Sequence, residues 1–214
     1  MYQEWHHLTF LHWSFDPAAL RPLIPRPLEL DTFDGHAWLG IVPFLIKKSR
    51  FRGIPWRIDF PETNVRTYVR LPNGDTGVWF FSLDAASLFA TLGARMSFRL
   101  PYMWSRMQVE VSGNRIHYHS DRTWPAAPGH FECRVETGDE IVANEFDAFL
   151  LYRYRLYTKW TFGDVEHVPY PLRKVRLLDL RHDLFKTGGP PVVVHYSPMV
   201  DVRIGAPHFG RFAG

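Results

Sequence analysis

The segment that decides the fold is residues 62–70, ETNVRTYVR, together with residues 78–83, VWFFSL, a few positions further on. Strand periodicity places alternate side chains of the first segment on opposite faces. The residues that share its polar face are Glu62, Asn64, Arg66, Tyr68 and Arg70. The second segment is apolar on both faces, and such a strand is normally covered on both sides. Because the intervening sequence predicts a hairpin turn, we expect the polar face to border a covered pocket.

A buried glutamate beside an arginine would give that pocket a specific chemistry. The guanidinium of Arg66 would anchor the carboxylate of a small molecule through paired hydrogen bonds. Glu62 would exchange a proton with the bound molecule as a general acid or base. Asn64 and Tyr68 would complete the same wall. The sequence leaves the alternative open, because a polar strand face in an antiparallel sheet ordinarily meets solvent.

The rest of the chain predicts many short strands and few helices. Asp16-Pro17 begins a helix over 17–23, with an N-cap carboxylate and a proline at the first helical position. Further helices are expected over 85–96 and 145–152. Turns are expected at Asp34-Gly35 and Phe162-Gly163-Asp164, and a long polar loop over 47–61. The predicted strands are 5–15, 28–32, 36–46, 62–70, 77–83, 102–111, 115–122, 131–136, 192–197 and 200–204.

The order of these elements favours one fold class. Strands that follow one another through short turns pair antiparallel, since parallel neighbours need longer crossovers. A sheet of so many strands ordinarily closes on itself to remove exposed edges. We therefore expect an α+β fold, mainly an antiparallel β-barrel or cone with about three short helices, in one domain spanning residues 1–214.

Composition narrows the function classes. The chain has 214 residues, of which 46% are hydrophobic and 22% charged, so it can form a sizeable core. Its net charge is only +3, and the arginines recur along the whole chain, so nucleic-acid binding is disfavoured. The basic residues between 173 and 181 are interpreted as a solvated face. No bilayer-crossing stretch or signal peptide is found, and a lone cysteine fits a cytoplasmic location.

Other reactive groups give weaker signals. His117 and His119 alternate on a strand, and three more histidines stand near the N-terminus, but no third ligand has a recognisable metal-site spacing, so no metal is predicted. Cys133 is interpreted as a buried, unreactive thiol. Nucleotide-binding glycine motifs and the serine-hydrolase elbow are absent. The Lys47-Lys48 pair would lower the pKa of an amine nucleophile, although a solvated pair is the simpler interpretation.

Several stretches together resemble the YqjF-like family of uncharacterised conserved proteins, a domain of unknown function. Each stretch is short, but their combination is specific and runs along almost the whole chain. They are residues 10–13, 16–25, 28–35, 60–69, 77–84, 149–150, 153–154, 156–158 and 195–197.

That family is distantly similar to acetoacetate decarboxylase, whose fold encloses a pocket for a small acid. The resemblance implies that Glu62 corresponds to a glutamate of the decarboxylase and that His6 replaces its pocket arginine. The decarboxylase forms a Schiff base through a lysine, but the matching residues 95–101, RMSFRLP, contain no lysine. The resemblance therefore implies the same pocket-enclosing fold without imine chemistry. It also implies that Arg95 or Arg99 lies near the position of the missing lysine.

The sequence thus predicts a protein that binds a small acidic or carbonyl-containing molecule without a cofactor. If it is an enzyme, lyase or hydrolase chemistry with Glu62 as general acid or base is expected. The ligand-binding candidates are Asn64, Arg66, Tyr68, Arg95, Arg99 and His6. The alternative is a non-catalytic binding or scaffold barrel, or a weak RNA binder. No membrane partner is expected, and the sequence leaves homo-oligomer formation open.

Overall fold

The computed structural model describes residues 1–50, 57–88, 91, 100–125, 128–158 and 161–209. Its strands form one 13-stranded sheet. The strands of the first half are β1 (Tyr2–Phe15), β2 (Glu29–Leu30), β3 (Ala37–Arg50), β4 (Ile58–Arg70), β5 (Thr76–Ala85) and β6 (Tyr102–Ser112). Those of the second half are β7 (Arg115–Trp124), β8 (His130–Ile141), β9 (Arg155–Tyr157), β10 (Thr161–His167), β11 (Leu172–His182), β12 (Val193–Ile204) and β13 (His208–Phe209).

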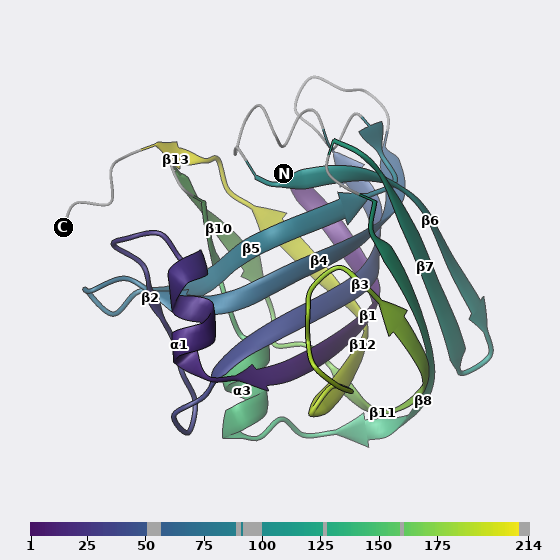
Figure 1. Ribbon diagram of the computed structural model, residues 1–214. Helices are drawn as coiled ribbons and strands as arrows, with labels where there is room; N and C mark the ends of the chain where they lie inside the picture. The colour runs from purple at the N-terminus through teal and green to yellow at the C-terminus, as the bar shows by residue number, and fades with distance from the viewer. Residues whose placement is uncertain (51–56, 89–90, 92–99, 126–127, 159–160, 210–214) are drawn as a thin grey trace.

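The sheet closes on itself twice. Besides its neighbours in the sheet order, β4 pairs with β5, and β10 pairs with β12. One ring therefore runs β5-β6-β7-β8-β11-β12-β1-β3-β4, and the other runs β10-β9-β5-β4-β3-β1-β12. Figure 1 shows the strands common to both rings side by side, with β6, β7 and β8 on the right and β10 on the left. The common strands form a wall whose two faces border different interiors.

This arrangement explains why the common strands are apolar on both faces. On one face, Leu8, Phe10 and Phe44 belong to a core that includes residues of β9 and β10. On the other face, Leu11 and Ile41 belong to a core that includes residues of β7 and β8. The strand 77–83 was expected to be covered on both sides, and its counterpart β5 is a member of both rings. The solvated alternative for β4 is wrong, because every residue from 62 to 69 is buried.

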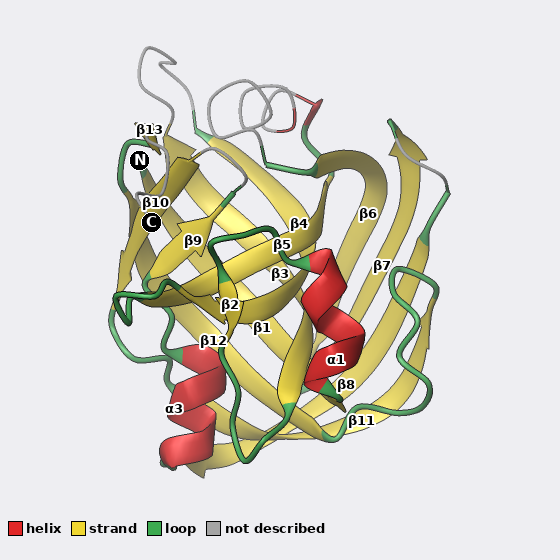
Figure 2. Ribbon diagram, turned by 60° about the vertical axis from the view of Figure 1, so that its left-hand side comes forward, coloured by secondary structure: helices red, strands yellow, loops and turns green. Residues whose placement is uncertain are grey.

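The short helices lie beside the strands of the sheet (Figure 2). Helix α1 (Pro17–Leu20) begins where predicted: the Asp16 carboxylate accepts a hydrogen bond from the Ala18 amide, and a 3-10 turn over Arg21–Leu23 continues it. Helix α3 (Glu145–Leu151) begins with a capping box between Asn144 and Asp147. Most of the helix predicted over 85–96 lies outside the described residues. Within the described part, no helix is long and apolar enough to cross a bilayer.

The turn and loop predictions had different outcomes. The turn predicted at Asp34-Gly35 is confirmed, because both residues have positive φ values and Phe33 bridges His36, but β2 pairs with β4 and not with β3, so the strands predicted over 28–32 and 36–46 do not pair around it. The loop predicted over 47–61 is shorter, because β3 continues to Arg50 and β4 already begins at Ile58. The predicted turn at 162–164 lies inside β10.

Pairing direction also differs from the prediction at one strand. β5 pairs in parallel with β6 and with β9, whereas the other strand pairings are antiparallel. The connection from β5 to β6 spans residues 86–101, which is long enough for a parallel crossover. The fold is therefore mainly but not wholly antiparallel.

Candidate functional site

A cavity of about 280 Å³ lies inside the ring that contains β9 and β10. Its wall is formed by residues of β1, β3, β4, β5 and β12 and of β9 and β10, together with Tyr102 of β6. The lining is mainly apolar, and the polar groups in it are few. This combination is typical of a site for a small organic molecule.

The polar face of β4 supplies the central strip of the cavity wall. Glu62, Asn64 and Arg66 all line the cavity, as strand alternation predicts, and all three are buried. A β-bulge at Phe81 adds one residue to β5, because Val65 pairs with Ser82 while Arg66 pairs with Phe80. The bulge keeps Leu83 on the same side as Phe80, so the apolar lining continues past it.

Glu62 is a buried carboxyl group with a perturbed proton affinity. It is only 4% exposed, and its Oε2 accepts a hydrogen bond of 2.8 Å from the Tyr102 hydroxyl. Burial raises the pKa of Glu62 to about 7, and the Tyr102 hydrogen bond only partly offsets this. Near neutral pH the side chain can therefore both give and accept a proton, as a general acid or base must.

Arg66 is a buried cation whose hydrogen-bonding capacity is not used up. Its guanidinium lies 5.6 Å from the ring centre of Phe10 and 5.9 Å from that of Tyr68. Its Nε and Nη2 atoms are buried and have no hydrogen-bond partner in the described part of the chain. Buried donors are nearly always paired in native proteins. These nitrogens are therefore placed to receive an acceptor from a bound molecule.

The other arginines of the cavity wall are neutralised by acidic residues. The Arg153 guanidinium contacts Asp31 Oδ2 at 2.6 Å and also donates to the Phe149 carbonyl. Arg155 contacts Asp164 at 2.9 Å and Asp75 at 2.7 Å. Their charges are balanced within the protein, which leaves Arg66 as the arginine of this lining with free donors.

Tyr68 lies on the same face of β4 as Arg66, in the core beside the cavity, and does not line the cavity. It is fully buried, its ring lies beneath the guanidinium groups of Arg66 and Arg153, and its hydroxyl is 2.6 Å from His12 Nε2. Burial holds the pKa of His12 well below its usual value, so this imidazole is neutral. Tyr68 thus positions the arginines and is not placed to contact a ligand.

Three other predicted residues have different outcomes. His6 does not line the cavity; its Nε2 pairs with Glu4 at 3.1 Å. A β-bulge at His7, which has a φ of 53°, shifts the alternation of β1, so Gln3 and Trp5 line the cavity and His6 faces away. Arg95 and Arg99 lie outside the described residues. His6 is therefore not part of this cavity, and the predictions for Arg95 and Arg99 stay predictions.

The sequence interpretation missed Tyr102, Arg153 and Arg155, which come from strands and loops distant from β4 along the chain. Arg153 stands in one of the stretches that resemble the YqjF-like family, and this was the available signal for it. The reading of Cys133 is confirmed, because the thiol is buried and burial raises its pKa. Lys47 and Lys48 lie in β3 and do not line the cavity.

Comparisons with known proteins give a family and a fold. Residues 2–201 match the model of a family described as an uncharacterized conserved protein, DUF2071. The uncharacterized protein YqjF of Bacillus subtilis (strain 168) is 37% identical over 217 residues, which cover 94% of this chain and 89% of YqjF.

Solved structures with the acetoacetate decarboxylase-like fold superpose on almost the whole chain. An acetoacetate decarboxylase-like enzyme from Sphingomonas wittichii RW1 gives a TM-score of 0.67 at 11% identity, over 98% of this chain and 92% of the enzyme. The enduracididine biosynthesis enzyme MppR complexed with pyruvate gives a TM-score of 0.63 at 13% identity, over 97% and 89% of the two chains. At these identities the likeness shows the fold alone, and the predicted fold family is confirmed.

Proposed function

The chain belongs to the DUF2071 family of uncharacterized conserved proteins, and we propose that its cavity binds a small molecule that carries a carboxylate, with Arg66 as the anchor. One observation carries this proposal: a buried guanidinium in the cavity wall has two nitrogens without hydrogen-bond partners in the part of the chain that the structure describes. A buried cation is costly unless an anion pairs with it. A bound carboxylate would supply both the negative charge and the hydrogen-bond acceptors.

The rest of the polar strip would bind the other end of the ligand. Asn64 lies between Glu62 and Arg66 on β4, and its Oδ1 is also buried, with no hydrogen-bond partner in the described ranges. Alternate residues on one face of a strand are about 7 Å apart. A carboxylate at Arg66 would therefore leave a hydroxyl or carbonyl group of a small acid near Asn64, with Glu62 beyond it.

The cavity size and the related structures support an organic acid of a few carbon atoms. MppR has been solved with pyruvate, a keto acid, in a fold that superposes on this one. The ring of strands around the cavity would then serve as a small barrel or cone that excludes water from the bound acid. Keto and hydroxy acids are the first compounds to test.

If turnover occurs, we infer that Glu62 transfers the proton and that no imine forms. The described lysines, Lys47, Lys48, Lys174 and Lys186, do not line the cavity. The stretch 95–101 also contains no lysine in the sequence. Proton transfer to or from a bound acid by a carboxyl group with a pKa near 7 suits lyase or hydrolase chemistry.

Ligand-dependent melting against a panel of small keto and hydroxy acids tests the binding proposal. The wild-type protein is expected to melt at a higher temperature with at least one acid of the panel, because a ligand that binds only the folded state stabilises it. In Arg66→Met the affinity for that acid should fall by about 2 kcal/mol, or roughly thirtyfold, which is typical of losing hydrogen bonds to a charged group.

Arg134→Met is the matched control, since Arg134 is half-exposed on β8 and does not line the cavity. Its shift should equal that of the wild type. The proposal would be wrong if no acid shifts the wild type, or if Arg66→Met and Arg134→Met respond alike. A borohydride-trapped adduct on any lysine would instead support imine chemistry.

A further inference from the structure

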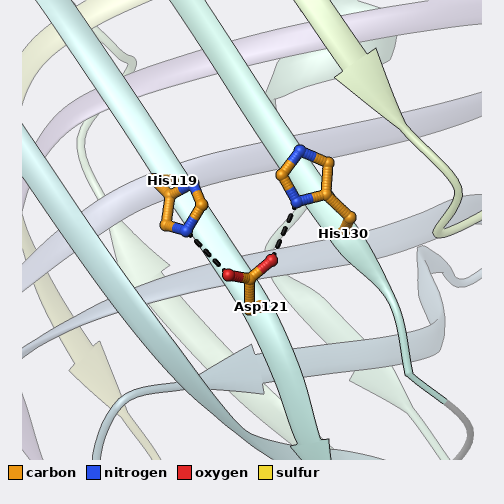
Figure 3. Close-up of side chains that lie close together, drawn as sticks. All are labelled: His119, Asp121 and His130. Atoms are coloured by element: carbon orange, nitrogen blue, oxygen red, sulfur yellow. Dashed lines mark hydrogen bonds and ion pairs between the residues drawn. The ribbon is translucent and has the colours of Figure 1, made fainter.

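Three side chains of types that can ligate a metal lie together on the outer face of the other ring, away from the cavity. Figure 3 shows the imidazoles of His119 and His130 on either side of the Asp121 carboxylate. His119 Nε2 is 2.9 Å from Asp121 Oδ2, and His130 Nδ1 is 2.8 Å from Asp121 Oδ1. None of the three lines the cavity. Sequence spacing could not reveal this set, because its third member comes from the next strand.

Strand geometry holds the three side chains together. His119 and Asp121 are two residues apart on β7, so they project from the same face. His130 begins β8 and pairs directly with Asp121 across the ladder. The backbone of His130 is fixed in turn, since its amide donates to Asp183 Oδ1 at 2.6 Å and its carbonyl accepts from the Asp183 amide.

The donor set and its spacing suit a divalent transition-metal ion. One donor atom from each of the three side chains lies within 4.8 Å of the others. Ligand atoms around a tetrahedral zinc ion, with bonds near 2.1 Å, are about 3.4 Å apart. The contacts of the two imidazole nitrogens with the Asp121 carboxylate, at 2.9 and 2.8 Å, are slightly shorter than this. Small side-chain rotations would therefore make room for the ion. Two imidazole nitrogens with one carboxylate oxygen favour zinc, iron(II), cobalt or nickel over magnesium or calcium.

We propose that His119, Asp121 and His130 form a surface site for a divalent transition-metal ion, with Zn²⁺ as the ion that best fits the donor set. The three side chains are 36%, 52% and 40% exposed, so an ion can reach them and water can complete its coordination. The bound ion would join β7 to β8 next to the connection between these strands. It would thereby stabilise the ring that does not contain the cavity.

The neighbouring histidine supplies an internal control. His117 lies on the same face of β7, but its imidazole contacts Glu132 at 3.0 Å and Glu110 at 3.7 Å, outside the proposed site. If the metal were instead held by His117 and His119, as alternation on one strand alone suggests, removal of His117 would abolish binding and removal of His130 would not. The two arrangements therefore predict opposite results.

Calorimetric titration of the tag-free protein with Zn²⁺, together with Co²⁺ absorption spectra, tests the site. The wild type should bind one equivalent and melt at a higher temperature with Zn²⁺. His130→Ala and Asp121→Asn should each lose at least about tenfold in affinity, because even the loss of an outer-shell partner of a metal ligand costs about that much. His117→Ala should bind as the wild type does, and melting without metal shows whether each variant is folded.

Any of three results would overturn the proposal. These are an absence of saturable Zn²⁺ binding by the wild type, undiminished binding by folded His130→Ala, and lost binding by folded His117→Ala. The first would mean that the cluster consists only of histidine–aspartate ion pairs. The other two would place the ion elsewhere. None of them bears on the cavity, whose ligand is tested separately.

Discussion

The two interiors on either side of the shared wall differ in whether their buried charged groups are paired with an opposite charge. In the ring of β6, β7 and β8, Arg122 contacts Asp84 at 2.8 Å and donates to Ser82, so the buried carboxylate has a cation beside it. Within the described residues of the ring of β9 and β10, Arg66 has donors without partners, and Glu62 has a hydroxyl but no cation among its hydrogen-bond partners. Both interiors are formed by alternate residues of the same strands.

This difference separates a structural ion pair from a binding site. Asp84 and Glu62 both have a pKa raised by burial, to about 6 and about 7. A raised pKa alone therefore does not identify a functional group here. The distinguishing features are the cavity next to Glu62 and the Arg66 guanidinium that shares its wall, whose Nε and Nη2 atoms have no hydrogen-bond partner among the described residues. Four substitutions test whether the distinction holds.

The largest effect is expected where a charge pair is broken. Arg122→Met leaves the Asp84 carboxyl, which is 0% exposed, without its cation. Near pH 8 this should lower the free energy of unfolding by about 4 kcal/mol, because breaking a buried pair strands one charge. Chemical denaturation measures the change. A loss below about 1 kcal/mol would mean that the pair contributes little and that the two interiors do not differ in this way.

The second prediction concerns pH and Glu62. Its pKa in the folded protein, about 7, lies above the ordinary 4.5, so the folded state retains a proton that the unfolded state has lost. Stability is therefore fully present below pH 4.5 and falls as the pH rises through 7. The total loss is about 3 kcal/mol, from 1.36 kcal/mol for each unit of pKa difference.

Glu62→Gln should remove this loss, because a neutral amide has no proton to lose. Near pH 8 the variant should be more stable than the wild type by about 3 kcal/mol, and near pH 4 the two should be alike. Denaturant unfolding across this range measures both. A variant that runs parallel to the wild type at every pH would show that the Glu62 carboxyl is not desolvated in the folded state.

The third prediction tests the closure of the cavity ring. A Cβ atom at Gly77 would lie 2.5 Å from the Arg155 carbonyl oxygen and 2.7 Å from Tyr157 Cε2, so Gly77→Ala should force β9 away from β5. The expected loss of stability is about 2 kcal/mol, which is typical of overpacking. Gly138→Ala on β8 is the matched control, since its Cβ would meet Lys174 Cβ at an ordinary 3.4 Å. Equal stability of the two variants in thermal melting would contradict the tight packing of β9.

Local sequence patterns were enough to predict the β4 side of the cavity wall, but not which other strands enclose the cavity. Alternation along residues 62–70 correctly grouped Glu62, Asn64 and Arg66, since a strand fixes its faces by itself. The helix beginning at Asp16-Pro17 was equally local. β11 was missed because Lys174 and Arg176 suggest a solvated charge run, although they alternate with the inward-facing Val175 and Leu177.

The remaining errors came from long-range pairing and from single inserted residues. The bulge at His7 turned His6 away from the cavity, and no residue type in the sequence marks it. The pairing between strands also decides which residues come together. It brings Tyr102 and Arg153 to the cavity from strands and loops far from β4 in the chain, and it places His130 beside Asp121 across the β7-β8 pair. Such register depends on the whole sheet, so alternation within one strand could not predict it.

The smallest change in stability is expected at Arg66, and this makes it the sharpest test of the comparison. Arg66→Met removes a buried charge that has no counter-ion among the described residues, and replacing such a charge by an apolar side chain is often neutral or stabilising. The loss of its contacts with Phe10 and Tyr68 opposes this gain by about 0.5–1 kcal/mol each.

The free energy of unfolding of Arg66→Met should therefore stay within about 1 kcal/mol of the wild type, measured by denaturant unfolding without ligand. Arg122→Met makes the same chemical change in the other interior and should lose several times as much. If Arg66→Met were as damaging as Arg122→Met, Arg66 would be a structural residue with a partner inside the protein. A stable Arg66→Met that no longer responds to carboxylates would show instead that the charge is retained for a ligand.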